Sequence, residues 1–132
     1  MTTKEILTAA KAILTAKGRT TTTLCDPKTG KCCALGAIVI AEGWTHDASA
    51  NRDSQHAGYV MAERSLAVPV LNAAISRYLE MNPERFGRMW SIWLNDPIPV
   101  DRVYGFNDDT RRIDDADVLN VFDIAIEMAD AV

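Results

Sequence analysis

The sequence has no long hydrophobic run and no excess of basic residues. Its apolar stretches fall short of the roughly 18 residues that a membrane-spanning helix needs, so we expect no membrane partner. Lys and Arg number 14 against 18 Asp and Glu, which gives a net charge of -4. Because proteins bind nucleic acid largely through clustered basic side chains, this balance predicts that nucleic acid is not a partner.

Cysteine is scarce as well, with three residues that all lie between positions 25 and 33. The first residues mix charged and apolar positions, without the basic start and apolar centre of a secretion signal. We therefore expect a cytoplasmic protein, in which an odd number of cysteines favours reduced thiols over a disulfide framework. Cys32 and Cys33 are adjacent, a spacing that is unfavourable for a mutual bridge.

What the chain does contain is the composition of an ordinary folded protein. Of its 132 residues, 48% are hydrophobic and 24% are charged, which is close to the average for soluble proteins. A chain of this length can bury roughly two thirds of its unfolded surface in one core. Since there is no internal repeat, linker or low-complexity segment, we expect a single globular domain over residues 1–132.

The first segment predicts a helix. Thr2 and Glu5 form a capping-box pattern, in which each side chain accepts a hydrogen bond from the backbone of the other residue. Apolar residues then recur on one helical face until Gly18, which offers a left-handed stop. This pattern predicts a helix over Thr3–Lys17.

A β-hairpin and a buried segment are predicted next. Arg19–Cys25 is rich in β-branched threonine, the turn sequence DPKTG follows it, and a return strand is expected near Lys31–Cys33. Cys33–Glu42 is apolar on nearly every side, so it fits either a buried helix or a buried strand. Its alanines and the glycine that follows it favour the helix.

The remainder predicts helices and one long loop. Asn95–Arg112 contains two prolines and little periodicity, so we expect it to be a loop. The expected helices run from about residue 54 to 66, 69 to 81, 83 to 94 and 114 to 129. Together these patterns predict an α+β protein that is mostly helical, with about five helices and a small β-hairpin packed on the first and last of them.

Two short motifs carry a resemblance to known proteins. The sequence CALGAI at positions 33–38 opens the apolar segment after the predicted hairpin, and Phe106, Asn107 and Asp108 precede the terminal helix. This arrangement resembles a family of small uncharacterised proteins of actinobacteria and their phages, in which an aromatic-Asn-Asp motif precedes the last helix. Phe106 stands where that family usually has tryptophan, and residues 44–103 form a longer middle segment here. The resemblance implies a fold and a phage or prophage setting, without an activity to carry over.

A metal site would have to use Cys25, Cys32 or Cys33 together with His46 and His56. Structural zinc sites usually take their ligands in pairs that are two to four residues apart. Six residues separate Cys25 from Cys32, and a second close pair is missing. The aspartates before the last helix also lack the alternating spacing and glycine of a calcium loop. We therefore predict no metal and no cofactor, and small buried thiols explain the cysteines equally well.

A thiol enzyme is the alternative function. Cys33 would begin a helix, where the partial positive charge lowers the pKa of a thiol and favours the nucleophilic thiolate. His46 or His56 would then act as the base. The surrounding sequence CCALG matches no hydrolase signature, so this interpretation competes with Cys33 as a simple core residue.

The preferred function is non-enzymatic binding of another protein, for which a host factor is one candidate. The contact residues would be Trp93, Tyr104, Phe106, Asn107 and Asp108, because aromatic side chains anchor many interfaces and the segment around them is acidic and irregular. Asn107 and Asp108 also fit a structural interpretation, in which their side chains close a turn against the terminal helix. The apolar helix near residues 69–81 leaves self-association open.

Overall fold

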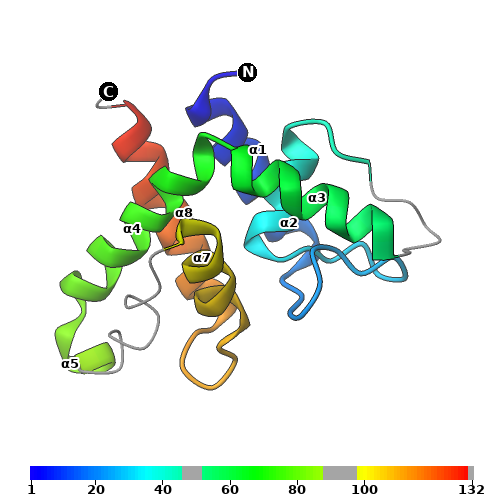
Figure 1. The fold of residues 1–132 in the computed structure, drawn as a ribbon. Coiled ribbons are helices and arrows are strands. Elements are labelled where there is room, and N and C mark those ends of the chain that lie inside the picture. The colour runs from blue at the N-terminus through cyan, green and yellow to red at the C-terminus, as the bar shows by residue number, and fades with distance from the viewer. Residues whose placement is uncertain (46–51, 88–97, 131–132) are drawn as a thin grey trace.

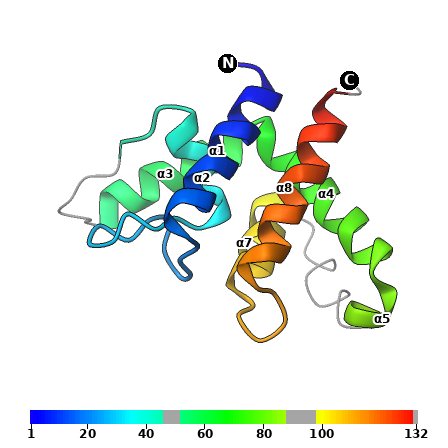
Figure 2. The same cartoon turned by 180° about the vertical axis from the view of Figure 1, so that it is seen from behind.

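The computed structural model describes residues 1–45, 52–87 and 98–130, and within these ranges the chain forms seven helices (Figure 1). Their bounds are α1 Thr3–Lys17, α2 Ala34–Ala41, α3 Arg52–Arg64, α4 Ala67–Met81, α5 Pro83–Phe86, α7 Pro99–Asp108 and α8 Asp115–Asp130. Helix α8 packs against both α1 and α4, and α2 contacts α1, α3 and α7. The beginning of α1 and the end of α8 lie at the same side of the molecule (Figure 2), where Lys4 and Asp130 form an ion pair of 2.8 Å.

The expected α+β class is wrong, because the described residues contain helices and no strand. Where the sequence predicts a β-hairpin, the chain makes isolated bridges, one of which pairs Cys25 with Cys32 in the antiparallel sense. The chain does reverse between these residues, but no ladder extends from the pair. The threonine segment turns away at Thr22, whose φ of 67° lies outside the extended region. Tertiary contacts override β-propensity here, because this segment bonds to side chains at the end of α7.

The prediction of a loop over Asn95–Arg112 is also wrong for ten of these residues, which form α7. Pro99 occupies the first turn of that helix, where its missing N–H removes no intrahelical hydrogen bond. The residues that α7 buries recur at helical spacing and are Val100, Val103, Phe106 and Asn107. The helical periodicity of α7 is present in the sequence, but two nearby prolines favour the prediction of a loop.

Other helix predictions are confirmed. Helix α1 has the predicted bounds, and its capping box between Thr2 and Glu5 is present. The segment after Cys33 is a helix and not a strand, and the terminal helix forms close to the predicted bounds. The predicted helix that begins at Pro83 extends in the described structure to Phe86, as α5. The helix ends there, because Gly87 follows with a φ of 47°, and residues 88–94 lie outside the described residues.

Helix α2 lies in the core and is covered closely by the preceding loop. Leu35, Ala37 and Ile38 of this helix are completely buried. A Cβ atom built on Gly36 would lie 2.0 Å from the carbonyl oxygen of Leu24, so only glycine allows the loop to cross the helix here. This close approach fixes the position of Leu24.

A buried carboxylate joins α8 to α4 and α5. Asp117 is 1% exposed, and its carboxylate accepts hydrogen bonds from the Tyr78 hydroxyl at 2.6 Å and from both terminal nitrogens of Arg85. Asp114 and Asp117 also accept hydrogen bonds from each other's backbone N–H at 2.9 Å, which caps α8. The guanidinium of Arg85 in turn lies 4.8 Å from the centre of the Phe86 ring. One acidic side chain thus fastens three helices.

Candidate functional site

The buried amide of Asn107 ties together the segments around the candidate site. Its Oδ1 accepts a hydrogen bond of 3.0 Å from the backbone N–H of Ala34, one of the N–H groups that α2 leaves unpaired. Its Nδ2 donates to the carbonyl oxygen of Thr20 at 3.1 Å. Its own carbonyl accepts a hydrogen bond of 3.0 Å from Arg19. Asn107 is 0% exposed, so its role is to position backbone and not to meet a partner.

Asp108 adds a second connection between α7 and the loop, closer to the surface. Its Oδ2 accepts a hydrogen bond of 3.0 Å from the backbone N–H of Thr22, and its Oδ1 accepts one of 3.0 Å from Asn107. A positive φ at a β-branched residue such as Thr22 costs about 1–3 kcal/mol, and it persists only where the surroundings hold it. The carboxylate of Asp108 therefore holds the loop in a strained conformation beside α7.

A small pocket, which we call the tyrosine pocket, opens between this loop, α3 and α7. The rings of Tyr59 and Tyr104 pack edge to face there, with their centroids 6.3 Å apart and their planes at 70°. The Tyr59 hydroxyl donates a hydrogen bond of 2.7 Å to Asp101 at the start of α7. The pocket has a volume of about 190 Å³ and is lined by Thr22, Thr23, Leu24, Gln55, Tyr59 and Tyr104.

Gln55 joins α3 to the loop at this pocket. Its Oε1 accepts hydrogen bonds from the backbone N–H of Leu24 at 3.2 Å and from the hydroxyl of Thr23 at 3.1 Å. The loop is thus fastened on two sides, by Gln55 from α3 and by Asp108 from α7. The pocket is consequently preformed, so binding of a ligand does not carry the entropic cost of ordering the loop.

The electrostatic environment of the tyrosine pocket is acidic. Burial, followed by the negative charge of Asp108 and a hydrogen bond to it, raises the pKa of Tyr104 to about 12. Burial also raises the pKa of Tyr59, and the hydrogen bond to Asp101 and the charges of Asp101 and Glu63 raise it further. Both phenols are therefore neutral at physiological pH, and none of the described lining residues is basic.

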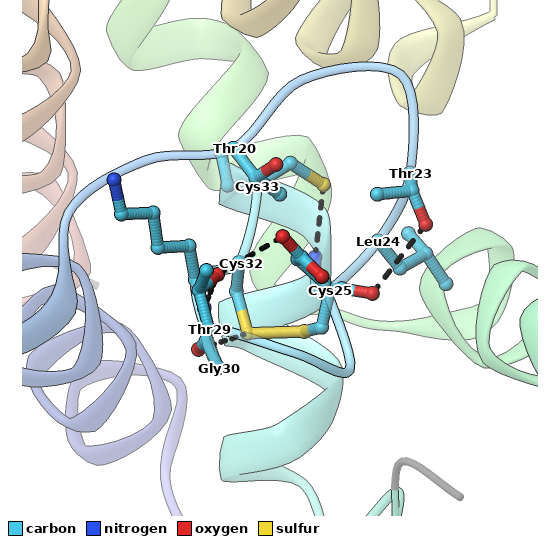
Figure 3. The surroundings of a disulfide bond; sticks show 12 residues. Thr20, Thr23, Leu24, Cys25, Thr29, Gly30, Cys32 and Cys33 are labelled. Atoms are coloured by element: carbon cyan, nitrogen blue, oxygen red, sulfur yellow. Dashed lines mark hydrogen bonds between the residues drawn. A yellow bond between two sulfur atoms is a disulfide. The ribbon is translucent and has the colours of Figure 1, made fainter. Parts of the chain in front are cut away.

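A disulfide anchors the other end of the loop. Cys25 and Cys32 are bonded to each other beneath the turn (Figure 3), so the expectation of three reduced thiols is wrong. The turn brings their backbones together, which the count of cysteines alone does not reveal. The disulfide fixes Cys25 directly after Leu24, which lines the tyrosine pocket.

The surroundings of Cys33 are those of a buried residue that caps a helix. It is the N-cap of α2, where its sulfur accepts a hydrogen bond of 3.3 Å from the backbone N–H of Gly36. The side chain is completely buried, and this burial raises the pKa of the thiol to about 12, outweighing the lowering effect of the Gly36 N–H. A nucleophile at neutral pH needs the opposite shift. His56, one of the two proposed bases, is exposed on α3, and His46 lies outside the described residues.

The structure brings together only some of the predicted contact residues. Tyr104 and Asp108 adjoin the tyrosine pocket, whereas Phe106 and Asn107 are buried and unavailable to a partner. Trp93 lies outside the described residues. Sequence reasoning missed Tyr59 and Gln55, together with the loop residues that complete the pocket. No local pattern marks them, because they meet only through the fold.

The described residues offer neither a metal site nor a membrane-spanning helix. Within residues 1–45, 52–87 and 98–130, no group of three or more His, Cys, Asp or Glu side chains is placed to hold a metal ion. Over the same part of the chain, none of the helices has both the length and the apolar character required to cross a membrane.

Comparison with known proteins places the chain in a family. No curated protein and no solved structure matches it. One family profile does match, and it covers residues 1–128 of the 132 in the chain. The resemblance to a family without established activity is confirmed at this level: the chain belongs to the family of unknown function DUF6197.

Proposed function

We propose that this protein is a non-enzymatic binding protein that contacts another protein through the tyrosine pocket. The observation that carries the proposal is a preformed pocket lined by two half-buried tyrosine rings, Tyr59 and Tyr104. Tyrosine is enriched at the residues that dominate protein interfaces, because it offers a large rigid ring together with a polar end. The binding function expected from the sequence is therefore retained, with a contact surface that differs from the expected one.

The size of the pocket favours a side chain over a free small molecule. Sites for small molecules commonly enclose roughly 300–1,000 Å³, whereas the tyrosine pocket has about 190 Å³. The enzymatic alternative loses its support at Cys33, whose thiol is buried and has a raised pKa.

The cellular setting that we propose is the cytoplasm of an actinobacterium that carries a phage or prophage, with a host protein as the partner. Its support is the resemblance of the CALGAI and Phe-Asn-Asp motifs to proteins of that origin. The disulfide between Cys25 and Cys32 weighs against a reducing compartment, where such bonds are rare. Alkylation of thiols in intact cells, followed by mass spectrometry, would show which state the pair has there.

Site-specific crosslinking tests the proposed contact. A photoreactive amino acid at His56, which is exposed on α3 beside Gln55, leaves the pocket itself intact. We expect it to form one discrete adduct with another protein in cells. Excess unlabelled wild-type protein should suppress the adduct, and excess Tyr104→Ala protein should not.

The matched control places the same photoreactive group at Glu127, an exposed position on α8. The proposal fails if both positions give the same adducts, or if Tyr104→Ala competes as well as the wild type. An adduct with a second copy of this chain alone would make the site a self-association surface and would also contradict the proposal.

A further inference from the structure

Three carboxylates surround the tyrosine pocket. Asp101 lies 2.7 Å from the Tyr59 hydroxyl, and Asp108 adjoins Tyr104. The charge of Glu63 also reaches Tyr59. The nearby guanidinium of Arg19 does not offset them, because Asp115 and the carbonyl oxygens of Asn107 and Ile113 already bind it.

A carboxylate engages the hydroxyl proton of Tyr59, one of the two tyrosines of the pocket. The Tyr59 hydroxyl donates a hydrogen bond to Asp101, and the negative charge of Asp108 lies close to Tyr104. The phenol oxygens and the ring faces that remain are electron-rich surfaces. Such surfaces attract cations, and most strongly where carboxylates stand close behind them.

We infer that the tyrosine pocket binds a basic side chain, arginine in preference to lysine, that the protein partner places against the rings of Tyr59 and Tyr104. This inference rests on the proposed function and names the chemistry of the partner. The planar guanidinium stacks on aromatic rings, and it sheds water more readily than an ammonium group does. Its five N–H donors can also bond to the hydroxyl oxygens of the tyrosines and threonines that line the pocket.

The size and the rigidity of the site are consistent with one such side chain. The volume of about 190 Å³ accommodates an extended side chain with a planar end, and not a folded peptide. The loop that forms one wall is already fixed by Gln55 and Asp108. Binding therefore requires little reorganisation of this chain.

The test uses a single side chain as the probe. Isotope-labelled protein is titrated with Nα-acetylarginine amide, and in parallel with Nα-acetylcitrulline amide, which has nearly the same shape and no charge. We expect the arginine probe to shift the amide signals of Thr22, Thr23, Leu24 and Tyr104, with a Kd in the millimolar range. Citrulline should bind roughly tenfold more weakly, since it lacks the cation that the rings and carboxylates attract.

Two variants with the same change in net charge locate the effect. Asp101→Asn removes a charge behind the pocket and keeps the shape of the side chain. Asp123→Asn removes a charge on α8, where Asp123 pairs with Lys11. We expect Asp101→Asn to weaken binding of the arginine probe by roughly threefold to tenfold, and Asp123→Asn to leave it unchanged.

The inference is overturned if arginine and citrulline bind equally, if neither shifts the signals of the pocket, or if both variants have the same effect. None of these results depends on the partner protein. Crosslinking at His56 with competition by Tyr104→Ala would still decide the proposed function. The titration therefore tests whether the pocket selects a cation, and the crosslinking tests separately whether it binds a protein.

Discussion

Asn107 connects α7 to two segments that are far from it in the sequence. It bonds the start of α2 through Ala34, the loop through Thr20, and Arg19 through its carbonyl oxygen. The sequence suggests that the amide of Asn107 closes a local turn. Its hydrogen-bond partners outside α7 lie 73 to 88 positions away instead. A sequence pattern identifies an asparagine that suits a turn, but it does not show which distant backbone groups need its amide.

Replacement of Asn107 by alanine should therefore destabilise the protein strongly. The change leaves the N–H of Ala34 and the carbonyl of Thr20 without their partner in a buried place. We expect a loss of about 3 kcal/mol in the free energy of unfolding, measured by urea denaturation. The control is Asn120→Ala, at an exposed asparagine whose one long hydrogen bond is 3.5 Å. Equal losses in the two variants would contradict this role of Asn107.

Individual helices were predictable to different degrees. Helix α1 was predicted in full, because its capping box and its stop at Gly18 are local signals. Local signals do not identify helix α7, since Pro99 fits a loop as well as it fits the first turn of a helix. The β-hairpin failed for the opposite reason. Its threonines and turn are correct local signals, but contacts with Asn107 and Asp108 prevented a ladder.

Residues of the candidate site were likewise predictable only where they belong to a local sequence pattern. Tyr104 and Asp108 were predicted as contact residues from their place in an aromatic and acidic segment, and both adjoin the tyrosine pocket. Tyr59 and Gln55 were not predictable, because α3 reaches the pocket only through its packing on α2. Periodicity identifies the buried face of a helix, but not which distant loop its exposed residues will meet.

The joint between α4, α5 and α8 should respond to acid. Burial of Asp117 opposes its negative charge, but the hydrogen bonds from Arg85 and Tyr78 outweigh this effect and hold its pKa below the usual value. A carboxyl with a lowered pKa stabilises the folded state above about pH 4, where it is ionised also in the unfolded chain. This stabilisation is lost as the pH falls through the lower pKa of the folded state.

The corresponding experiment compares melting temperatures of the wild type and Asp117→Asn between pH 7 and pH 2. We expect the wild type to melt higher at pH 7 and the difference to shrink below about pH 4. Asp130→Asn, which removes an exposed ion pair with Lys4, should have little effect at any of these pH values. A difference between wild type and Asp117→Asn that stays constant with pH would contradict the lowered pKa.

At the scale of the whole molecule, the thiol of Cys33 reports how the protein opens. The side chain is 0% exposed and begins α2, a helix that contacts α1, α3 and α7. A reagent in solution can therefore reach this sulfur only after these helices separate. The raised pKa adds a second barrier, because at neutral pH almost none of the thiol is ionised.

Without a reductant, native protein should consequently label with iodoacetamide very slowly at pH 8. In unfolding concentrations of urea we expect one fast label, at Cys33, and after reduction two more, at Cys25 and Cys32. Mass spectrometry of the labelled protein counts them, and the native rate should rise with urea in step with the unfolded fraction. Rapid labelling of native Cys33 at neutral pH would restore the thiol-enzyme alternative.

The ion pair between Lys4 and Asp130 has a consequence for how this chain could be used as a building block. It marks where the start of α1 and the end of α8 lie side by side, since these helices pack together and packed helices lie only about 8–10 Å apart. The chain could then be inserted into a surface loop of another protein. The two ends of that loop would join the neighbouring ends of α1 and α8 without being stretched. The chain is therefore suited to insertion into another protein as a guest module.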